Sequence, residues 1–136
     1  MTYRAICEAQ LPIDEGSRAH VYRDSLGIET IGIGRNLQNG LSDDEILYLF
    51  KNDLDKAEKG ARAICPSFDT LSDARKAVLI NMCFNMGQAR VAGFIGMFGA
   101  IAAKDWNAAA QHMLASKWAV QVGARAQRLA KAMREG

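Results

Sequence analysis

The sequence predicts an α+β fold, in which a small N-terminal β-hairpin lobe is followed by a mainly α-helical lobe. Two short β-favouring runs, separated by a turn signal, lie within residues 17–40, and apolar residues recur with helical spacing from residue 42 onward. Of the 136 residues, 49% are hydrophobic and 24% are charged, as in ordinary globular proteins. We expect one domain over 1–136: a hairpin lobe at about 17–40, a bridging helix at about 42–60, and a helical lobe at about 61–136 that includes the N-terminal helix.

The hairpin is predicted from its turn residues and from a period of two. Asp24-Ser25-Leu26-Gly27 is a turn signal between two β-favouring runs. In the returning strand, alternation places Ile31 and Ile33 on one apolar face and Thr30 with two glycines on the other. We therefore expect a small, polar face that lets a ligand approach the backbone closely.

Everything after Gly40 is predicted to be helical. Ser42 and Glu45 form a capping box at the start of the bridging helix, and Gly87 is expected to end the helix that begins near residue 71. The apolar segment from Val91 to Ala103 is expected to be one buried central helix, because it lacks a polar face. Asp105 and Ser116 are predicted to cap the next two helices, and the last helix carries the apolar stripe Val122, Ala126, Leu129 and Met133.

Composition excludes several classes of protein. The longest apolar segment is shorter than the roughly 20 residues that a membrane span needs, and the first residues lack the apolar core of a secretory signal. The three cysteines (Cys7, Cys65 and Cys83) form no CxxC pair, so we interpret them as reduced thiols. The two histidines show no metal-binding spacing. We expect neither a metal nor another cofactor.

Positive charge is concentrated at the C-terminal end. Residues 115–136 carry a net charge of +4, contributed by Lys117, Arg125, Arg128, Lys131 and Arg134 against Glu135. Such a helix could meet nucleic acid, a membrane or another polyanion, and it could equally be a solvated helix face.

Three residues are candidates for catalysis: Glu15, Asp24 and Thr30. Glu15 is expected at the C-terminal end of the first helix beside Asp14, where the helix dipole and a neighbouring carboxylate both favour a proton-donating form. Asp24, in an exposed turn, should stay ionised. Two carboxyl groups with opposite protonation are what acid–base cleavage of a glycosidic bond requires. Spacing alone still favours structural roles, since Asp is a common turn former.

The residues around these candidates resemble a known family. The segments Ile13–Arg18 and Val21–Gly34, followed by Ile80-Asn81-Met82-Cys83-Phe84-Asn85-Met86-Gly87, resemble the T-even-phage type of lysozyme, glycoside hydrolase family 24. Further matches continue in the same order over roughly residues 8–136. The resemblance implies a lysozyme-like fold and an endolysin-type muramidase that cleaves the β-1,4 bond between N-acetylmuramic acid and N-acetylglucosamine in bacterial peptidoglycan, with inversion.

The resemblance also implies a role for each site residue. Glu15 matches the general acid, Asp24 the carboxylate that supports the cationic transition state or activates water, and Thr30 the hydroxyl that positions the water. Phe84, Asn36 and His112 stand at substrate-binding positions. Arg125 matches an arginine that pairs with the catalytic glutamate, with Gln121 and Trp118 in its supporting shell.

Further expectations follow for the whole molecule. We expect a monomer that binds peptidoglycan, binds no nucleic acid and does not insert stably into membranes. It should accumulate in the bacterial cytoplasm and reach the wall after a separate membrane-permeabilising protein acts. Arg128 is expected to pair with Asp14. Pro12 is expected to kink the helix that carries Glu15, or to be the residue at which that helix restarts.

Two other functions remain open. The chain could be a catalytically silent wall-binding module, although the intact Glu15, Asp24 and Thr30 argue against this. It could also be a small helical nucleic-acid-binding protein, but its C-terminal charges are not interleaved with stacking aromatic residues.

Overall fold

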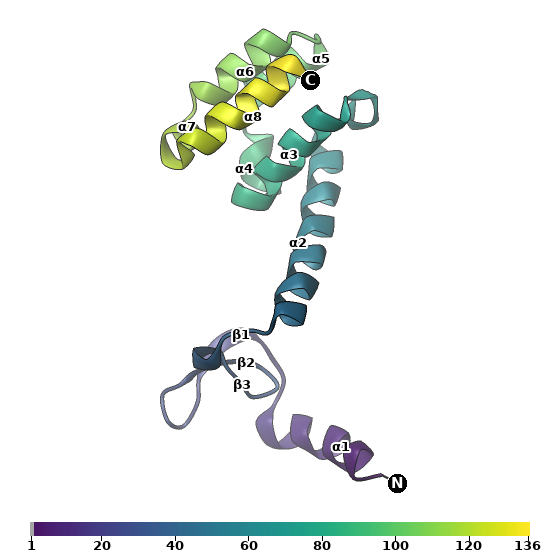
Figure 1. Ribbon diagram of the computed structural model, residues 1–136, viewed down its shortest axis with the longest axis vertical. Coiled ribbons are helices and arrows are strands. Elements are labelled where there is room, and N and C mark those ends of the chain that lie inside the picture. The colour runs from purple at the N-terminus through teal and green to yellow at the C-terminus, as the bar shows by residue number, and fades with distance from the viewer. Residues whose placement is uncertain (1) are drawn as a thin grey trace. The chain divides into compact units, whose positions relative to one another are not determined.

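The computed structural model describes residues 2–136 and divides into two units, Met1–Leu47 and Tyr48–Gly136. The strands of the described residues lie in the first unit, whereas the second unit is helical. The predicted α+β class is therefore confirmed (Figure 1). No helix among residues 2–136 combines the length and the apolar character needed to cross a membrane.

The first helix, α1 (Tyr3–Glu15), places Glu15 at its C-terminal end. It begins after Thr2, whose hydroxyl accepts a hydrogen bond from the N–H of Ala5 at 3.2 Å. The prediction that the helix restarts at Pro12 is wrong, because the proline lies inside a continuous helix. Its missing N–H removes one hydrogen bond of the last turns. Gly16, with φ of 77°, ends the helix.

A three-stranded antiparallel sheet follows, with the order β1-β2-β3. The predicted hairpin is its first two strands, and a third short strand extends it. Thr30 lies in the middle strand, opposite Tyr22 on one side and Asn36 on the other. The strands and the short 3-10 helix that follows them are β1 (Arg18–Arg23), β2 (Glu29–Gly32), β3 (Arg35–Asn36) and η1 (Leu37–Asn39).

The predicted alternation of faces in the returning strand is wrong. Thr30 is the buried residue, only 4% exposed, whereas Ile33 is 50% exposed. The strand ends at Gly32, and both Gly32 and Gly34 have positive φ values, of 67° and 66°. Left-handed backbone at Gly32, between Ile31 and Ile33, breaks the period of two, so Ile33 does not continue the face of Ile31.

Helix α2 (Asp43–Ile64) starts with the predicted capping box. The N–H of Ser42 donates to Glu45 Oε1 at 2.9 Å, and the N–H of Glu45 donates to Ser42 Oγ at 3.3 Å. The helix is longer than predicted and ends at Ile64. In its C-terminal half, Ala57 and Ala61 are buried.

The second unit is a bundle of short helices in which α6 lies side by side with α5 and α8 (Figure 1). The predicted caps are confirmed: Asp105 accepts from the N–H of Ala108 at 3.0 Å, and Ser116 from that of Ala119 at 3.2 Å. The elements are η2 (Phe68–Thr70), α3 (Asp73–Met86), α4 (Gln88–Ala92), α5 (Ile95–Ala102), α6 (Trp106–Leu114), α7 (Lys117–Val122) and α8 (Ala124–Glu135).

The segment from Val91 to Ala103 is not the single buried helix that was predicted. It contains the end of α4, a break at Gly93 and Phe94, and then α5. The N–H of Gly93 closes a tight turn onto the carbonyl of Arg90 at 3.1 Å, which ends the first helix. The buried side chains of α5 include that of Met97, but Ile95 is 80% exposed.

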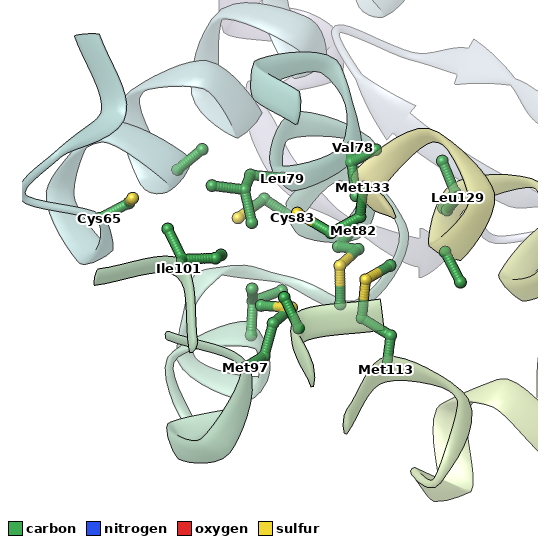
Figure 2. Close-up of a cluster of buried hydrophobic side chains, with 14 of the residues drawn as sticks. Cys65, Val78, Leu79, Met82, Cys83, Met97, Ile101, Met113, Leu129 and Met133 are labelled. Atoms are coloured by element: carbon green, nitrogen blue, oxygen red, sulfur yellow. The ribbon is translucent and has the colours of Figure 1, made fainter. Parts of the chain in front are cut away.

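The core of the second unit is rich in methionine. Figure 2 shows the side chains of Met82, Met97 and Met113 gathered between the helices, and all three are fully buried. Unbranched, polarisable side chains fill irregular gaps between short helices well. This core fixes α3, which carries Phe84, and α8, which carries Arg125.

Candidate active site

Glu15 lies against the turn between β2 and β3. A Cβ atom built on Gly34 would be 2.8 Å from Glu15 Oε2 and 3.0 Å from its Cδ, closer than real contacts allow. The glycine therefore makes room for the carboxyl group. Gly34 also has φ of 66°, a backbone conformation that favours glycine. A glycine is therefore required here both by this conformation and by the space that the Glu15 carboxyl group occupies.

Asp24 forms the turn between β1 and β2. Its Oδ1 accepts hydrogen bonds from the N–H of Leu26 at 2.8 Å and from that of Ile28 at 2.9 Å. Gly27, with φ of 78°, completes the turn, and its N–H donates to the carbonyl of Asp24 at 3.0 Å. The turn predicted from the sequence is confirmed. Two donors fix Oδ1, and no group of residues 2–47 donates to Oδ2.

Thr30 is joined to Asp24 through Ile28. The Thr30 hydroxyl donates to the carbonyl of Ile28 at 2.9 Å, and the backbone N–H of Asp24 donates to the same oxygen at 3.0 Å. The N–H of Ile28 in turn donates to the Asp24 carboxylate. The turn and the middle strand thus hold the two side chains at a fixed separation.

Asn36 is the neighbour of Thr30 in β3, and its side chain has a structural role. Its Oδ1 accepts from the N–H of Gln38 at 2.8 Å, which caps the short helix η1. The amide nitrogen makes no hydrogen bond within residues 2–47, so it is the part of Asn36 that is free to contact a ligand.

An ion pair connects the third strand to the start of α2. Arg35 binds the carboxylate of Glu45, which also accepts from the N–H of Ser42. The backbone hydrogen bond from Ser42, and after it the Arg35 guanidinium, lower the pKa of Glu45 below its ordinary value. These contacts connect the sheet to the first turn of α2.

In the second unit, Arg125 is held by Asn81. Its Nε and Nη2 atoms both donate to Asn81 Oδ1, at 3.0 and 2.7 Å. Asn81 lies on α3 and Arg125 at the start of α8, so this fork joins two helices at a half-buried place. Asn81 was not among the predicted site residues.

Phe84 lies beside this fork and is 43% exposed. Its ring packs edge-to-face on that of Phe50, with 6.0 Å between the ring centroids. A groove runs along this surface, and it is lined by Phe50, Leu54, Ala77, Ile80, Asn81, Phe84 and Arg125. The structure therefore brings Phe84 and Arg125 to one groove.

The indole of Trp118 is buried and well anchored. Its Nε1 donates to Asn85 Oδ1 at 2.8 Å, and its ring packs edge-to-face on Phe94 at 6.2 Å. Gln121, one turn further along α7, is exposed. Trp118 thus supports α3 by holding Asn85, whereas Gln121 makes no hydrogen bond through its side chain within residues 48–136.

His112 lines a different hollow from Phe84. It lies over Gly96, where a Cβ atom would be 2.5 Å from the imidazole Nδ1. Phe94 and Ser116 are among the other residues of this hollow between α5 and α6. The substrate-binding role predicted for His112 stays a prediction.

Four residues that hold the candidate side chains in place were not predicted from the sequence: Ile28, Gly34, Asn81 and Asn85. A signal existed for the two asparagines, since their spacing of four places both on one face of α3 together with Phe84. Gly34 and Ile28 act through the backbone, which residue type does not reveal.

Comparisons with known proteins agree on one family. The family model described as "Phage lysozyme" matches residues 13–135. "Probable T4-type lysozyme 1" of Dictyostelium discoideum is 28% identical over 93% of this chain and 92% of its own length. "Probable T4-type lysozyme 2" of the same organism is 23% identical over the same shares. The "Pre-baseplate central spike protein Gp5" of Enterobacteria phage T4 is 28% identical over 85% of this chain, but only 25% of the spike protein is matched.

Proposed function

Because the chain belongs to the phage lysozyme family and is a glycoside hydrolase of the lysozyme type, we propose that it cleaves peptidoglycan with Glu15, Asp24 and Thr30. The bond attacked is the β-1,4 linkage between N-acetylmuramic acid and N-acetylglucosamine. Glu15 is the general acid, while Asp24 and Thr30 position the attacking water.

The position of Glu15 supports its role as the acid. Its carboxyl group rests on the bare backbone of Gly34 and takes no hydrogen bond from residues 2–47. It also stands at the C-terminal end of α1. The proposed role requires this group to give a proton to the oxygen of the leaving sugar.

The contacts of Asp24 support a role as an oriented carboxylate. Two backbone N–H groups fix Oδ1, so Oδ2 points in a defined direction and can accept a proton from water or lie beside a cationic sugar. Thr30 has already given its only proton to the carbonyl of Ile28, so its hydroxyl oxygen can only accept. A water held by Thr30 must donate to it.

The single observation that carries this proposal is the shared attachment of Asp24 and Thr30 to Ile28, which fixes a carboxylate and an accepting hydroxyl as a pair. We propose inversion, in which the base and the acid stand roughly 6.5–9.5 Å apart with a water between them. Following the first anomer released by NMR tests this outcome. Initial α product supports inversion, whereas initial β product refutes it.

A wall-clearing assay tests the roles of the carboxyl groups. Glu15→Gln and Asp24→Asn should each slow the clearing of purified peptidoglycan by about 10²–10⁴-fold. Glu29→Gln, an exposed carboxylate at the start of β2, is the matched control and should clear at the rate of the wild type. Equal and negligible clearing by wild type and Glu15→Gln would leave only a wall-binding module.

A further inference from the structure

One face of α8 carries a row of cations that the proposed reaction does not use. Arg128, Lys131 and Arg134 are all exposed and recur every third residue, so they lie along one side of the helix. They line a shallow groove with Leu114, at the end of the neighbouring α6. We call this surface the cationic groove; its two end cations stand about 9 Å apart along the helix axis.

No carboxylate of residues 48–136 forms an ion pair with this row. Among residues 48–136, the ion pairs are those that Arg62 forms with Glu58 and Asp69, and none includes a residue of α8. Glu135 is the single acid that lines the cationic groove, against three cations. Three like charges on one helix face repel one another, so an anion bound along this face would relieve their repulsion.

The packing of α8 decides which anion fits. Its apolar stripe, including Leu129 and Met133, is buried in the core, so the helix has no apolar face left to insert into a membrane. No aromatic residue lines the groove, and stacking on nucleic-acid bases is therefore not provided for. The anion that suits the groove is therefore a flexible, hydrated polymer with spaced negative charges.

We propose that the cationic groove binds the free carboxylates of the peptide stems of peptidoglycan. This inference rests on the proposed function, because it assigns to α8 the anionic part of the same substrate. The groove would hold the enzyme on the insoluble wall through several weak, salt-sensitive contacts, while the sugar chain is cut elsewhere.

The test is a double variant that removes charge without touching the candidate site. Lys131→Gln with Arg134→Gln should weaken sedimentation with purified sacculi about threefold to tenfold and make the remaining binding less sensitive to salt. Arg128 stays unchanged, so the variant removes two of the three cations of the groove. Hydrolysis of a short uncharged chito-oligosaccharide should keep its kcat/KM.

A matched control removes the same charge from another surface. Lys51→Gln with Lys59→Gln changes two exposed lysines of α2 and should bind sacculi as the wild type does. Equal losses in the two double variants would overturn the proposal, because net charge alone would then explain the binding. A drop in Tm for the α8 variant alone calls for repeating the comparison well below both melting temperatures.

Three further arms identify the ligand. Converting the stem carboxylates of the sacculi to amides should abolish the difference between wild type and the α8 variant. A difference that persists on amidated sacculi contradicts the proposal. So does a difference seen only on anionic phospholipid vesicles or only on duplex DNA.

The inference and the proposed function fail separately. Binding is measured in a Glu15→Gln background, so no cleavage is needed. If wild type does not clear walls but the α8 variant still loses sacculus binding, the proposed reaction fails and the binding surface stands.

Discussion

The carboxylate of Asp24 and the hydroxyl of Thr30 are bound to the same residue: Ile28 donates its N–H to the first at 2.9 Å and accepts from the second at 2.9 Å. The sheet therefore fixes the two groups through backbone atoms, whose positions a change of side chain at Ile28 leaves in place. In the proposed reaction this fixes where the attacking water is held.

Replacing Thr30 should separate its structural from its functional contribution. Thr30→Val keeps the shape but removes the hydrogen bond to Ile28, which should lower the free energy of unfolding by about 1 kcal/mol. Wall clearing should fall by much more, about a hundredfold, because the water loses its acceptor. Thr30→Ser restores the hydroxyl and should recover most of the clearing. Urea unfolding and clearing rates, measured on the same preparations, check both effects.

Gly34→Ala should displace the Glu15 side chain. Its new methyl group meets Glu15 Oε2 at 2.8 Å, and its φ of 66° strains any L residue. Gly40→Ala is the matched control, since Gly40 has φ of 72° but nothing within 4 Å of the added atom. Both variants should lose about 1–2 kcal/mol of stability, whereas only Gly34→Ala should lose clearing activity as well. Equal activity in the two variants would mean that the position of Glu15 does not matter.

The contribution of Glu45 to the stability of the protein should be lost in acid. Its pKa lies below the usual value of 4.5 because Ser42 and Arg35 bind the carboxylate. A carboxyl group whose pKa is lower in the folded state stabilises the fold at a pH above its pKa in the unfolded state. That stabilisation is lost as the pH falls through its pKa in the folded state. Glu45→Gln should therefore lower the urea midpoint at neutral pH, and the difference from wild type should shrink well below pH 4.5. A constant difference across this range would contradict the assignment.

The three thiols should react at different rates. Cys7 is exposed, whereas Cys65 is 2% and Cys83 5% exposed, and burial raises the pKa of Cys83. In the native protein a thiol reagent should modify one cysteine quickly and the other two only after unfolding. Cys7→Ser should remove the fast phase entirely. A fast phase that persists would show that the core of the second unit opens readily.

Local signals predicted the elements well. The capping box of Ser42 and Glu45, the Asp24 turn and the cap at Asp105 depend on residues within four positions of one another, so the sequence displays them directly. The glycines at 32 and 34 were misread because a positive φ is decided by the surrounding structure.

Contacts between distant parts of the chain were harder to predict. Arg125 and Asn81 are 44 positions apart, and nothing in either segment alone indicates that they meet. The resemblance named Arg125 but not its partner. The break at Gly93 and Phe94 was missed for a similar reason, since an unbroken apolar run does not show where packing ends one helix and starts another.

We propose above all that this chain hydrolyses the bond on the reducing side of N-acetylmuramic acid. Mass spectrometry of the soluble fragments, after reduction with borohydride, tests it most directly. We expect fragments that end in N-acetylmuramitol from wild type and almost none from Glu15→Gln. Fragments that end in N-acetylglucosaminitol or in a 1,6-anhydro sugar, or equal release by both proteins, would contradict it.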